Sequence, residues 1–336
     1  LSFSAIGFLP CLDCQCSVAA TPTKSRNVTR LAPSPTGALH LGNARTFLVN
    51  WAMARQHGWE VVLRIEDLDT PRVKAGAVEE TIRVLSTLGL DWDSGPIVQS
   101  HDLTPYREAM EALARKGRVY ACGLTRGEIA SAASAPNEGD HEERFDPSLR
   151  PASAGLPAEF RDEGTNWRLL VEPGDVAFED GFAGPQQRDP SRTVGDFVVW
   201  TKRGQPSYQL AVVVDDARQG ITRIVRGDDL LDSAARQLLL YRALGVEPEP
   251  TYWHLPLVRG EDGRRLAKRH GDTRIDHYLA LGAAPERIVA LLGRWCGMGS
   301  HDRLSAGDFA AAFNLRTMPK DDIIFRPEDH QWLCKS

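Results

Sequence analysis

Apolar and polar positions alternate along the first part of the chain in a way that predicts strands and helices in turn. Residues 28–32 (VTRLA) form a short apolar run, which is typical of a strand. Residues 43–58 place Phe47 and Trp51 at a helical interval and end at Gly58, which predicts a helix. The run EVVLRIEDLD that follows predicts a buried strand with acidic residues at its end. This order makes a βαβ unit, which implies a parallel sheet.

The alternation continues and is then interrupted. Further helices are predicted at about 74–89 and in DLTPYREAMEALARKG, but from about 121 to 190 the chain becomes rich in Ala, Ser, Pro and Glu without a clear period. This texture predicts an insertion with long loops. Regular patterning resumes in DFVVWTK, PSYQLAVVVDD and ITRIVRG, before a helix in DSAARQLLLYRALG and the run YWHLPLV. These runs indicate the second half of an α/β sheet.

These changes of pattern predict five parts. They are a disordered leader (1–27), the first half of a Rossmann-like catalytic domain (28–120), the insertion (121–190), the second half of that domain (191–258), and a basic loop with a helical region that has no further strong strand (259–336).

Composition narrows the class of protein. The chain has 336 residues, of which 42% are hydrophobic and 25% charged, as in an ordinary globular protein. Its net charge of −5 gives no overall basic character, so a nucleic-acid partner would have to be held by local patches. No window approaches the ~18 apolar residues that a membrane span requires.

The cysteines do not form a disulfide framework. Three of the six lie in CLDCQC (Cys11, Cys14 and Cys16), where no fourth metal ligand is near. The opening segment has no basic residue before Lys24, so it makes a poor secretory signal. We therefore expect a cytoplasmic protein without a membrane partner.

The segment RLAPSPTGALHLGN (30–43) has two interpretations. The predicted helix begins near Leu41, so backbone amides at its first turn would attract an anion. His40 and Asn43 lie three residues apart and can face one bound group, while Gly37 and Gly42 allow backbone to approach a ligand. Alternatively, the prolines and glycines only shape a turn and His40 caps the helix.

A second segment, RGEDGRRLAKRHGD (259–272), concentrates basic residues in a glycine-bounded loop: Arg259, Arg264, Arg265, Lys268 and Arg269. A basic loop suits a leaving polyphosphate, because cations neutralise charge that develops in the transition state. Taken singly, such a loop can also be a solvated basic turn.

The two segments together resemble the HIGH and KMSKS signatures of class I aminoacyl-tRNA synthetases. The motifs LRIEDLDTPR, GLDWD, YREAMEALARKGRVYAC, YQLAVVVDD, IVRGDDLLDSAARQLLLYRALG and HLPLV extend the resemblance to the glutamyl-tRNA synthetase group, from about residue 28 to 330. This resemblance implies a class I catalytic domain with a parallel Rossmann-like sheet, an inserted connective segment and a helical C-terminal region.

Within that group the chain is closer to a short paralogue that transfers glutamate to queuosine at the wobble position of tRNA(Asp). A glutamyl-tRNA synthetase usually carries Asn where this chain has Val212, and continues well beyond Ser336 into an anticodon-binding region. A truncated synthetase that charges tRNA(Glu) is the alternative. A third hypothesis is a non-catalytic synthetase-like binding module.

The resemblance implies the roles of individual residues. The glutamate pocket would comprise Arg30, Ser34, Glu66, Tyr208 and Arg226; ATP would be bound by Thr36, Gly37, His40, Gly42, Asn43, Lys268 and Arg269; and His40, Asn43 and Lys268 would be catalytic. Magnesium would accompany ATP, and the protein would be a monomer. An Arg grips a carboxylate in a bidentate manner and a Glu can hold an ammonium group. Alternatively, Glu66 forms a surface salt bridge with Arg64 or Arg72, and Tyr208 is a half-buried core residue.

The chain departs from the family's pattern at two places. Ala267 stands where the second signature has Ser, so one hydroxyl donor to phosphate is missing. The paralogue usually carries a zinc site, but its four ligand positions here are Cys122, Leu124, Phe145 and Leu149. Because three of them lack a donor atom, zinc is not expected. Packing of these apolar side chains could hold the insertion instead, at roughly 1.5 to 3 kcal/mol for each fully buried one.

Overall fold

The predicted βαβ unit is present in the computed structural model of the chain, which describes residues 26–69, 73–125, 128–129, 144–264, 266 and 272–334. The elements of this first half are β1 (Val28–Leu31), α1 (Leu41–His57), β2 (Glu60–Ile65), α2 (Ala77–Thr87), β3 (Ser94–Val98) and α3 (Thr104–Arg115). Helix α1 ends as predicted at Gly58, whose φ of 64° is left-handed and suits a residue without a side chain. Strands β1, β2 and β3 pair in parallel.

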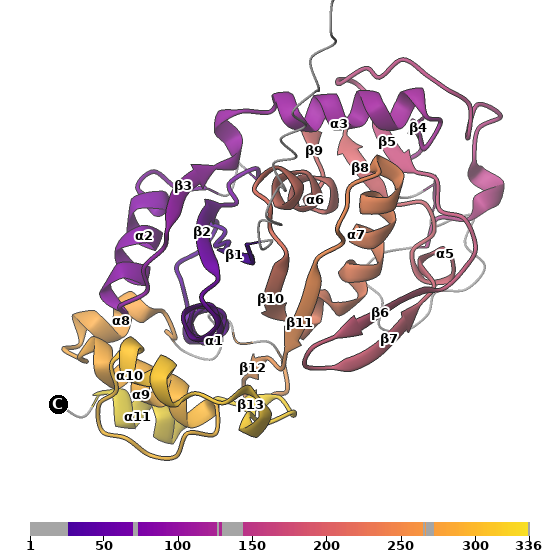
Figure 1. Cartoon of the computed structure of the whole chain (residues 1–336). Helices are drawn as coiled ribbons and strands as arrows, with labels where there is room; N and C mark the ends of the chain where they lie inside the picture. Colours follow the sequence, from indigo (N-terminus) through magenta and orange to yellow (C-terminus); the bar gives the residue numbers. More distant parts are fainter. Residues whose placement is uncertain are drawn as a thin grey trace, which may run out of the picture.

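The second half of the sheet lies directly beside the first. Strands β10 (Arg223–Gly227) and β11 (Thr251–Leu255) pair in parallel. The backbone N–H of Thr222, just before β10, donates to the carbonyl oxygen of Val28 at 2.9 Å, so β1 and β10 are neighbours. The order β3-β2-β1-β10-β11 can be followed from left to right in Figure 1. Strand order reverses between β1 and β10, and open α/β sheets bind ligands at such a point, beyond the carboxyl ends of the strands.

Helices cover this sheet through one large core. The buried side chains of Leu48 and Val49 on α1 belong to the same apolar cluster as Leu31 of β1 and Leu63 of β2. Helices α6 (Tyr208–Arg218) and α7 (Leu231–Leu244) belong to the second half of the chain, and α7 ends at the left-handed Gly245. None of the helices in the described part of the chain is long and apolar enough to cross a membrane.

The region expected to be loops contains several strands. Strand β5 (Asn166–Leu169) pairs with β4 (Val119–Cys122) and β8 (Val198–Thr201) in an antiparallel sheet that also includes β9 (Gln205–Pro206). Strands β6 (Val176–Asp180) and β7 (Gly184–Arg188) form a hairpin, and β6 adds to the catalytic sheet beside β11. A short helix, α5 (Pro190–Thr193), follows the hairpin.

A second difference concerns residues 208–218. The sequence places the apolar run AVVV with the second half of the sheet, but these residues form helix α6. Residues Leu210 to Asp216 are all buried, so the run has no polar face that would reveal a helical period. Ser207 begins the helix by accepting a hydrogen bond from the backbone N–H of Leu210 at 3.4 Å.

The C-terminal region is helical, as predicted. It contains α8 (Ile275–Ala280), α9 (Pro285–Trp295), α10 (Ala306–Ala312) and α11 (Pro327–Cys334). Two short strands, β12 (Val258–Arg259) and β13 (Ile323–Ile324), pair in parallel and connect this region to the catalytic half. The helices gather below α2, at the lower left of Figure 1.

Candidate active site

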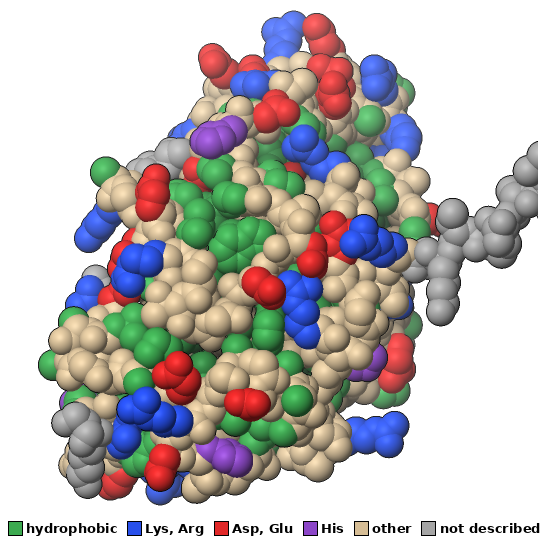
Figure 2. Space-filling view, turned by 60° about the vertical axis from the view of Figure 1, so that its left-hand side comes forward, with side chains coloured by type: hydrophobic (Ala, Val, Ile, Leu, Met, Phe, Trp, Pro, Cys, Tyr) green, Lys and Arg blue, Asp and Glu red, His purple; other side chains and the backbone are tan. Residues whose placement is uncertain are grey.

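A cavity of about 540 Å³ lies where β1 and β10 diverge. Ten of the residues proposed from the sequence line it: Arg30, Ser34, Thr36, Gly37, His40, Gly42, Asn43, Glu66, Tyr208 and Arg226. They come from β1, the segment after it, the first turn of α1, the end of β2, the first turn of α6 and the end of β10. In Figure 2 charged side chains of both signs are scattered over one face of the molecule, and apolar side chains gather near its centre.

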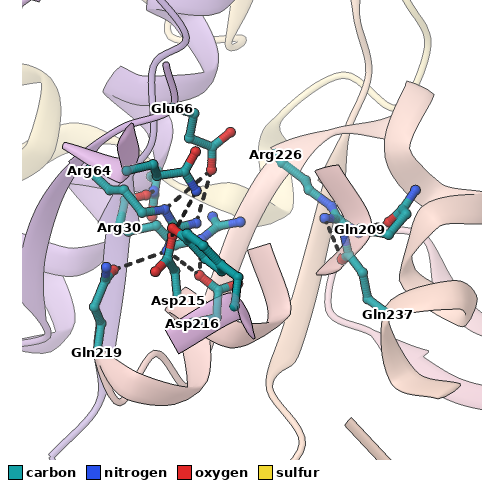
Figure 3. A network of polar contacts seen from close by, with 12 residues as sticks. Arg30, Arg64, Glu66, Gln209, Asp215, Asp216, Gln219, Arg226 and Gln237 are labelled. Atoms are coloured by element: carbon teal, nitrogen blue, oxygen red, sulfur yellow. Dashed lines mark hydrogen bonds and ion pairs between the residues drawn. The ribbon is translucent and has the colours of Figure 1, made fainter. Parts of the chain in front are cut away.

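One wall of the cavity is an ionic network, which we call the Arg30 wall (Arg30, Arg64, Glu66 and Asp216; Figure 3). Asp216 is fully buried and accepts from Nε of Arg30 at 3.2 Å and from Nη1 of Arg64 at 2.7 Å. Arg64 also donates from Nη2 to Oε1 of Glu66 at 3.0 Å. In the described part of the chain, the two terminal nitrogens of Arg30 have no hydrogen-bond partner.

Two members of the network, Arg64 and Glu66, have shifted pKa values. Burial alone would lower the pKa of Arg64, but the carboxylates of Asp216 and Glu66 outweigh it and raise that pKa above its usual range. Burial raises the pKa of Glu66, and the attraction of Arg64 and Arg30 only partly opposes this shift. The alternative salt bridge between Glu66 and Arg64 exists, with Arg64 fully buried and Glu66 partly buried, and Glu66 also faces the cavity.

We call the opposite wall the Arg226 wall (Arg226, His254, Gln237 and Asp180). The groups that accept directly from its arginine are neutral. Arg226 donates from Nε to Nε2 of His254 at 2.9 Å and from Nη1 to Oε1 of Gln237 at 2.8 Å. Nη2 donates to the carbonyl oxygen of Leu230 at 3.2 Å. Asp180 contacts this arginine only through His254, whose Nδ1 lies 2.6 Å from Oδ2 of Asp180. Figure 3 shows Arg226 and Gln237 apart from the ionic network.

The HLGN segment forms the end of the cavity at the start of α1. His40 precedes the helix, but its side chain makes no capping hydrogen bond, so the alternative of a capping histidine is not supported. A side chain on Gly42 would approach the imidazole of His40 to 3.3 Å, so glycine leaves room for this ring. Residues near the start of the C-terminal region hold this segment in place. The backbone N–H of Leu41 donates to the carbonyl oxygen of Thr273 at 3.0 Å, and that of Ile275 donates to the carbonyl oxygen of Leu39 at 2.9 Å.

Comparison with known proteins decides the family. The profile described as tRNA synthetases class I (E and Q), catalytic domain, matches residues 27–329. A glutamyl-Q tRNA(Asp) synthetase from Rhodopirellula baltica is 45% identical over 306 residues, covering 88% of this chain and 90% of the relative. Another, from Symbiobacterium thermophilum, is 42% identical over 88% of this chain and 94% of the relative. The chain belongs to the glutamyl-Q tRNA(Asp) synthetase family.

Longer relatives give the same fold. A glutamate–tRNA ligase from Geobacter sulfurreducens is 36% identical over 90% of this chain but only 64% of its own length. The crystal structure of glutamate-tRNA synthetase from Elizabethkingia anophelis matches with a TM-score of 0.74 and 25% identity, covering 92% of this chain and 70% of that one. The expected class I catalytic domain is thereby confirmed, and the protein is a ligase of this class.

The second signature of the synthetase lies largely outside the described residues. This applies to Arg265, Ala267, Lys268 and Arg269, so the roles of Lys268 and Arg269 stay predictions. Leu266, within this signature, is described, and its backbone N–H donates to the carbonyl oxygen of the cavity-lining Val258 at 3.1 Å. Thr273, which follows the signature, accepts a hydrogen bond from the backbone N–H of Leu41 in the HLGN segment. The leader cysteines Cys11, Cys14 and Cys16 also lie outside the described residues.

The four positions at which the family resemblance implied zinc ligands form an apolar cluster in this synthetase. Phe145 is fully buried beside the buried Cys122, and the partly buried Leu124 and Leu149 pack against them. The guanidinium of Arg168 lies 4.3 Å from the centre of the Phe145 ring. The predicted packing is thus complete for Phe145, whereas Leu124 and Leu149 are only partly buried. Within the described residues no group of His, Cys, Asp or Glu side chains could hold a metal ion, and the lack of zinc stays a prediction.

Several residues of the two walls were not predicted: Asp180, Asp216, Gln237 and His254. Each lies in or next to an apolar run and is buried. A charged or polar side chain in a buried segment requires a partner, which is a signal that the sequence does contain. The sequence cannot, however, say which partner each of them has.

Proposed function

We propose that the synthetase activates glutamate with ATP and transfers it to queuosine at the wobble position of tRNA(Asp). The observation that carries this proposal is the charge pattern of one cavity. Arg30 and Arg226 stand on opposite walls and Glu66 lies at the end of β2, which suits a substrate with two carboxylates and one ammonium group. The names of the relatives support the same substrate and acceptor.

In the first step, a carboxylate oxygen of glutamate attacks the α-phosphorus of ATP, and the bond to pyrophosphate breaks. The glutamyl-adenylate then reacts with a hydroxyl of queuosine, which forms an ester and releases AMP. No side chain has to act as a nucleophile, so the protein contributes positioning and charge stabilisation. Magnesium is expected to enter with the phosphates of ATP, as part of that substrate.

The HLGN segment is proposed to receive ATP. Its helix N-terminus offers backbone amides to phosphate, with His40 and Asn43 on the same turn and Thr36, Gly37 and Gly42 nearby. Lys268, with Arg269, would stabilise the charge that develops on the leaving pyrophosphate. We expect a monomer in the cytoplasm.

Glutamate-dependent exchange of pyrophosphate into ATP tests activation. The short paralogues, as the family resemblance implies, activate glutamate without tRNA, whereas glutamyl-tRNA synthetases require it. We expect exchange without tRNA, and aspartate and glutamine serve as control substrates. Exchange that appears only with tRNA(Glu) would favour the longer enzyme's activity, and no exchange under any condition would favour a binding module.

Transfer of labelled glutamate tests the acceptor. The assay compares tRNA(Asp) that contains queuosine, tRNA(Asp) with unmodified guanosine at the wobble position, and tRNA(Glu). We expect label only on the first of these. Label on tRNA(Glu) would contradict the proposal.

The role of Lys268 has a separate test. If Lys268 acts mainly in the transition state, Lys268→Ala should lower the exchange rate roughly a hundredfold, or ~2.7 kcal/mol, while ATP binding weakens much less. Ala267→Ser should raise the rate several-fold by restoring the family's hydroxyl. A silent Lys268→Ala variant would remove this residue from the catalytic set.

A further inference from the structure

We infer that His254 is a positioning residue that must be neutral to hold Arg226 ready for a substrate carboxylate. This inference rests on the proposed function and adds to it two groups, His254 and Asp180, that do not line the cavity. The imidazole of His254 is fully buried, between Asp180 on β6 and Arg226 on β10.

The contacts of His254 determine where its proton lies. Nε of Arg226 can only donate, so Nε2 of His254 must accept and carries no hydrogen. Nδ1 therefore holds the proton and donates it to Oδ2 of Asp180 at 2.6 Å. Asp180 is itself fixed by the backbone N–H groups of Phe182 at 3.0 Å and Ala183 at 2.8 Å. Asp180 thus fixes the orientation of the imidazole through Nδ1, while Nε2 faces Arg226.

Arg226 is held by hydrogen bonds that use only some of its N–H donors. A guanidinium has five N–H donors, and His254, Gln237 and Leu230 take one each. Among the described residues no other group takes its remaining two donors, which are left for a ligand in the cavity and match the two oxygens of a carboxylate. The guanidinium also lies 5.1 Å from the centre of the Tyr252 ring, which stacks on His254. Rotation of Arg226 away from the cavity would break all of these contacts.

Protonation of His254 would replace the hydrogen bond between its Nε2 and Arg226 with a repulsion. Nε2 would then present a hydrogen and a positive charge to Nε of Arg226, at a place where the two atoms are 2.9 Å apart. The charged groups that face the imidazole are Arg226 from β10 and Asp180 from β6, and on its own strand it meets the neutral ring of Tyr252. Burial lowers the pKa of His254 and the charge of Arg226 lowers it further. Asp180 and the backbone of Leu230 oppose this, but the net shift is downward, so the neutral form prevails at neutral pH.

Two substitutions separate the contacts of His254. In His254→Gln the amide oxygen can take the place of Nε2 and accept from Arg226, without a titrating group. In His254→Asn the amide nitrogen can take the place of Nδ1 and donate to Asp180, but no acceptor reaches Arg226. The control is His57→Gln at the end of α1, where the ring contacts Met53 O outside the cavity.

The Michaelis constants for glutamate and ATP are measured by pyrophosphate exchange. At neutral pH we expect His254→Asn to raise the constant for glutamate roughly tenfold or more, with that for ATP changed less than about twofold, and His254→Gln to stay within about threefold of the native enzyme. Below about pH 6.5 the constant for glutamate should rise more steeply in the native enzyme than in His254→Gln.

Equal values for the two variants, or no effect of His254→Asn, would overturn the inference. A native enzyme without exchange would instead refute the proposed function. Should His254→Asn fail to fold, the pH profiles of the native enzyme and of His254→Gln decide, because both keep Glu66, whose own titration faces the cavity. A steeper acidic rise of the glutamate constant in the native enzyme supports the inference, and identical profiles overturn it.

Discussion

The two walls of the cavity each present an arginine, but they hold it by different physics. On the Arg30 wall the guanidinium is paired with the buried carboxylate of Asp216, which Arg64 shares. On the Arg226 wall the direct acceptors in the described part of the chain are neutral: an imidazole, an amide and a backbone carbonyl. Part of the positive charge of Arg30 is thus compensated within the protein, whereas that of Arg226 is left for the ligand. The first wall should matter more for stability, and the second more for affinity.

The largest expected effect is on folding and comes from the ionic wall. Asp216→Asn should lower the free energy of unfolding by ~3–5 kcal/mol, because two buried arginines would lose their shared carboxylate. Chemical denaturation measures this change. The matched control is Glu249→Gln, which removes an exposed pair with Arg242 at 2.7 Å and should cost less than ~1 kcal/mol. A small effect of Asp216→Asn would refute the structural role of this wall.

The next effect is on affinity and comes from the neutral wall. Arg226→Gln should raise the apparent constant for glutamate about a hundredfold, or ~2.7 kcal/mol, as expected when a charge-assisted contact with a carboxylate is lost. Its unfolding free energy should fall less than that of Asp216→Asn. Exchange kinetics and denaturation on the same preparation test both statements. The comparison fails if stability suffers more than affinity.

A smaller effect on affinity is expected at Arg30. Arg30→Ala should raise the constant for glutamate at least tenfold, ~1.4 kcal/mol, while Asp216 keeps its partner Arg64. The control is Arg55→Ala, which removes an exposed pair with Asp91 outside the cavity. Unchanged glutamate dependence would remove Arg30 from the pocket.

The smallest effect is a pH dependence of stability from His254. Its pKa is lowered in the folded state, so below about pH 6.5 the unfolded chain binds a proton that the native imidazole resists. Stability should therefore fall with decreasing pH, by at most ~1.4 kcal/mol per pH unit from this group. Denaturation of the native protein and of His254→Gln at several pH values isolates the contribution. An identical pH dependence in both would contradict it.

Much of this architecture could be predicted from the sequence where the pattern has a clear period. The βαβ unit at the start of the catalytic domain and the helical C-terminal region are where they were expected. The run AVVV was assigned to the sheet and not to a helix for two reasons. A helix buried on all sides shows no alternation of apolar and polar residues, and Val side chains favour strands. Strands β5, β6 and β7 were missed because a long polar stretch without a period precedes them.

The site could be predicted in part. Ten expected residues line one cavity because parallel strands bring their carboxyl ends to the same edge of the sheet. The partners behind them, such as Asp216 and His254, come from elements far apart in the sequence, and their pairing depends on the packing of α6 and β11 against β1 and β10. No spacing along the chain records that packing.

The hairpin of β6 and β7 limits how this enzyme could be shortened. Residues 121–190 would seem removable as a unit, because they separate the two halves of the catalytic domain. However, β6 runs beside β11, and its last residue, Asp180, orients the imidazole behind Arg226. A deletion of the whole segment would therefore remove a strand of the sheet together with a support of the pocket. An engineer seeking a minimal glutamate-activating domain would have to keep residues 176–188 and close the chain upstream of them.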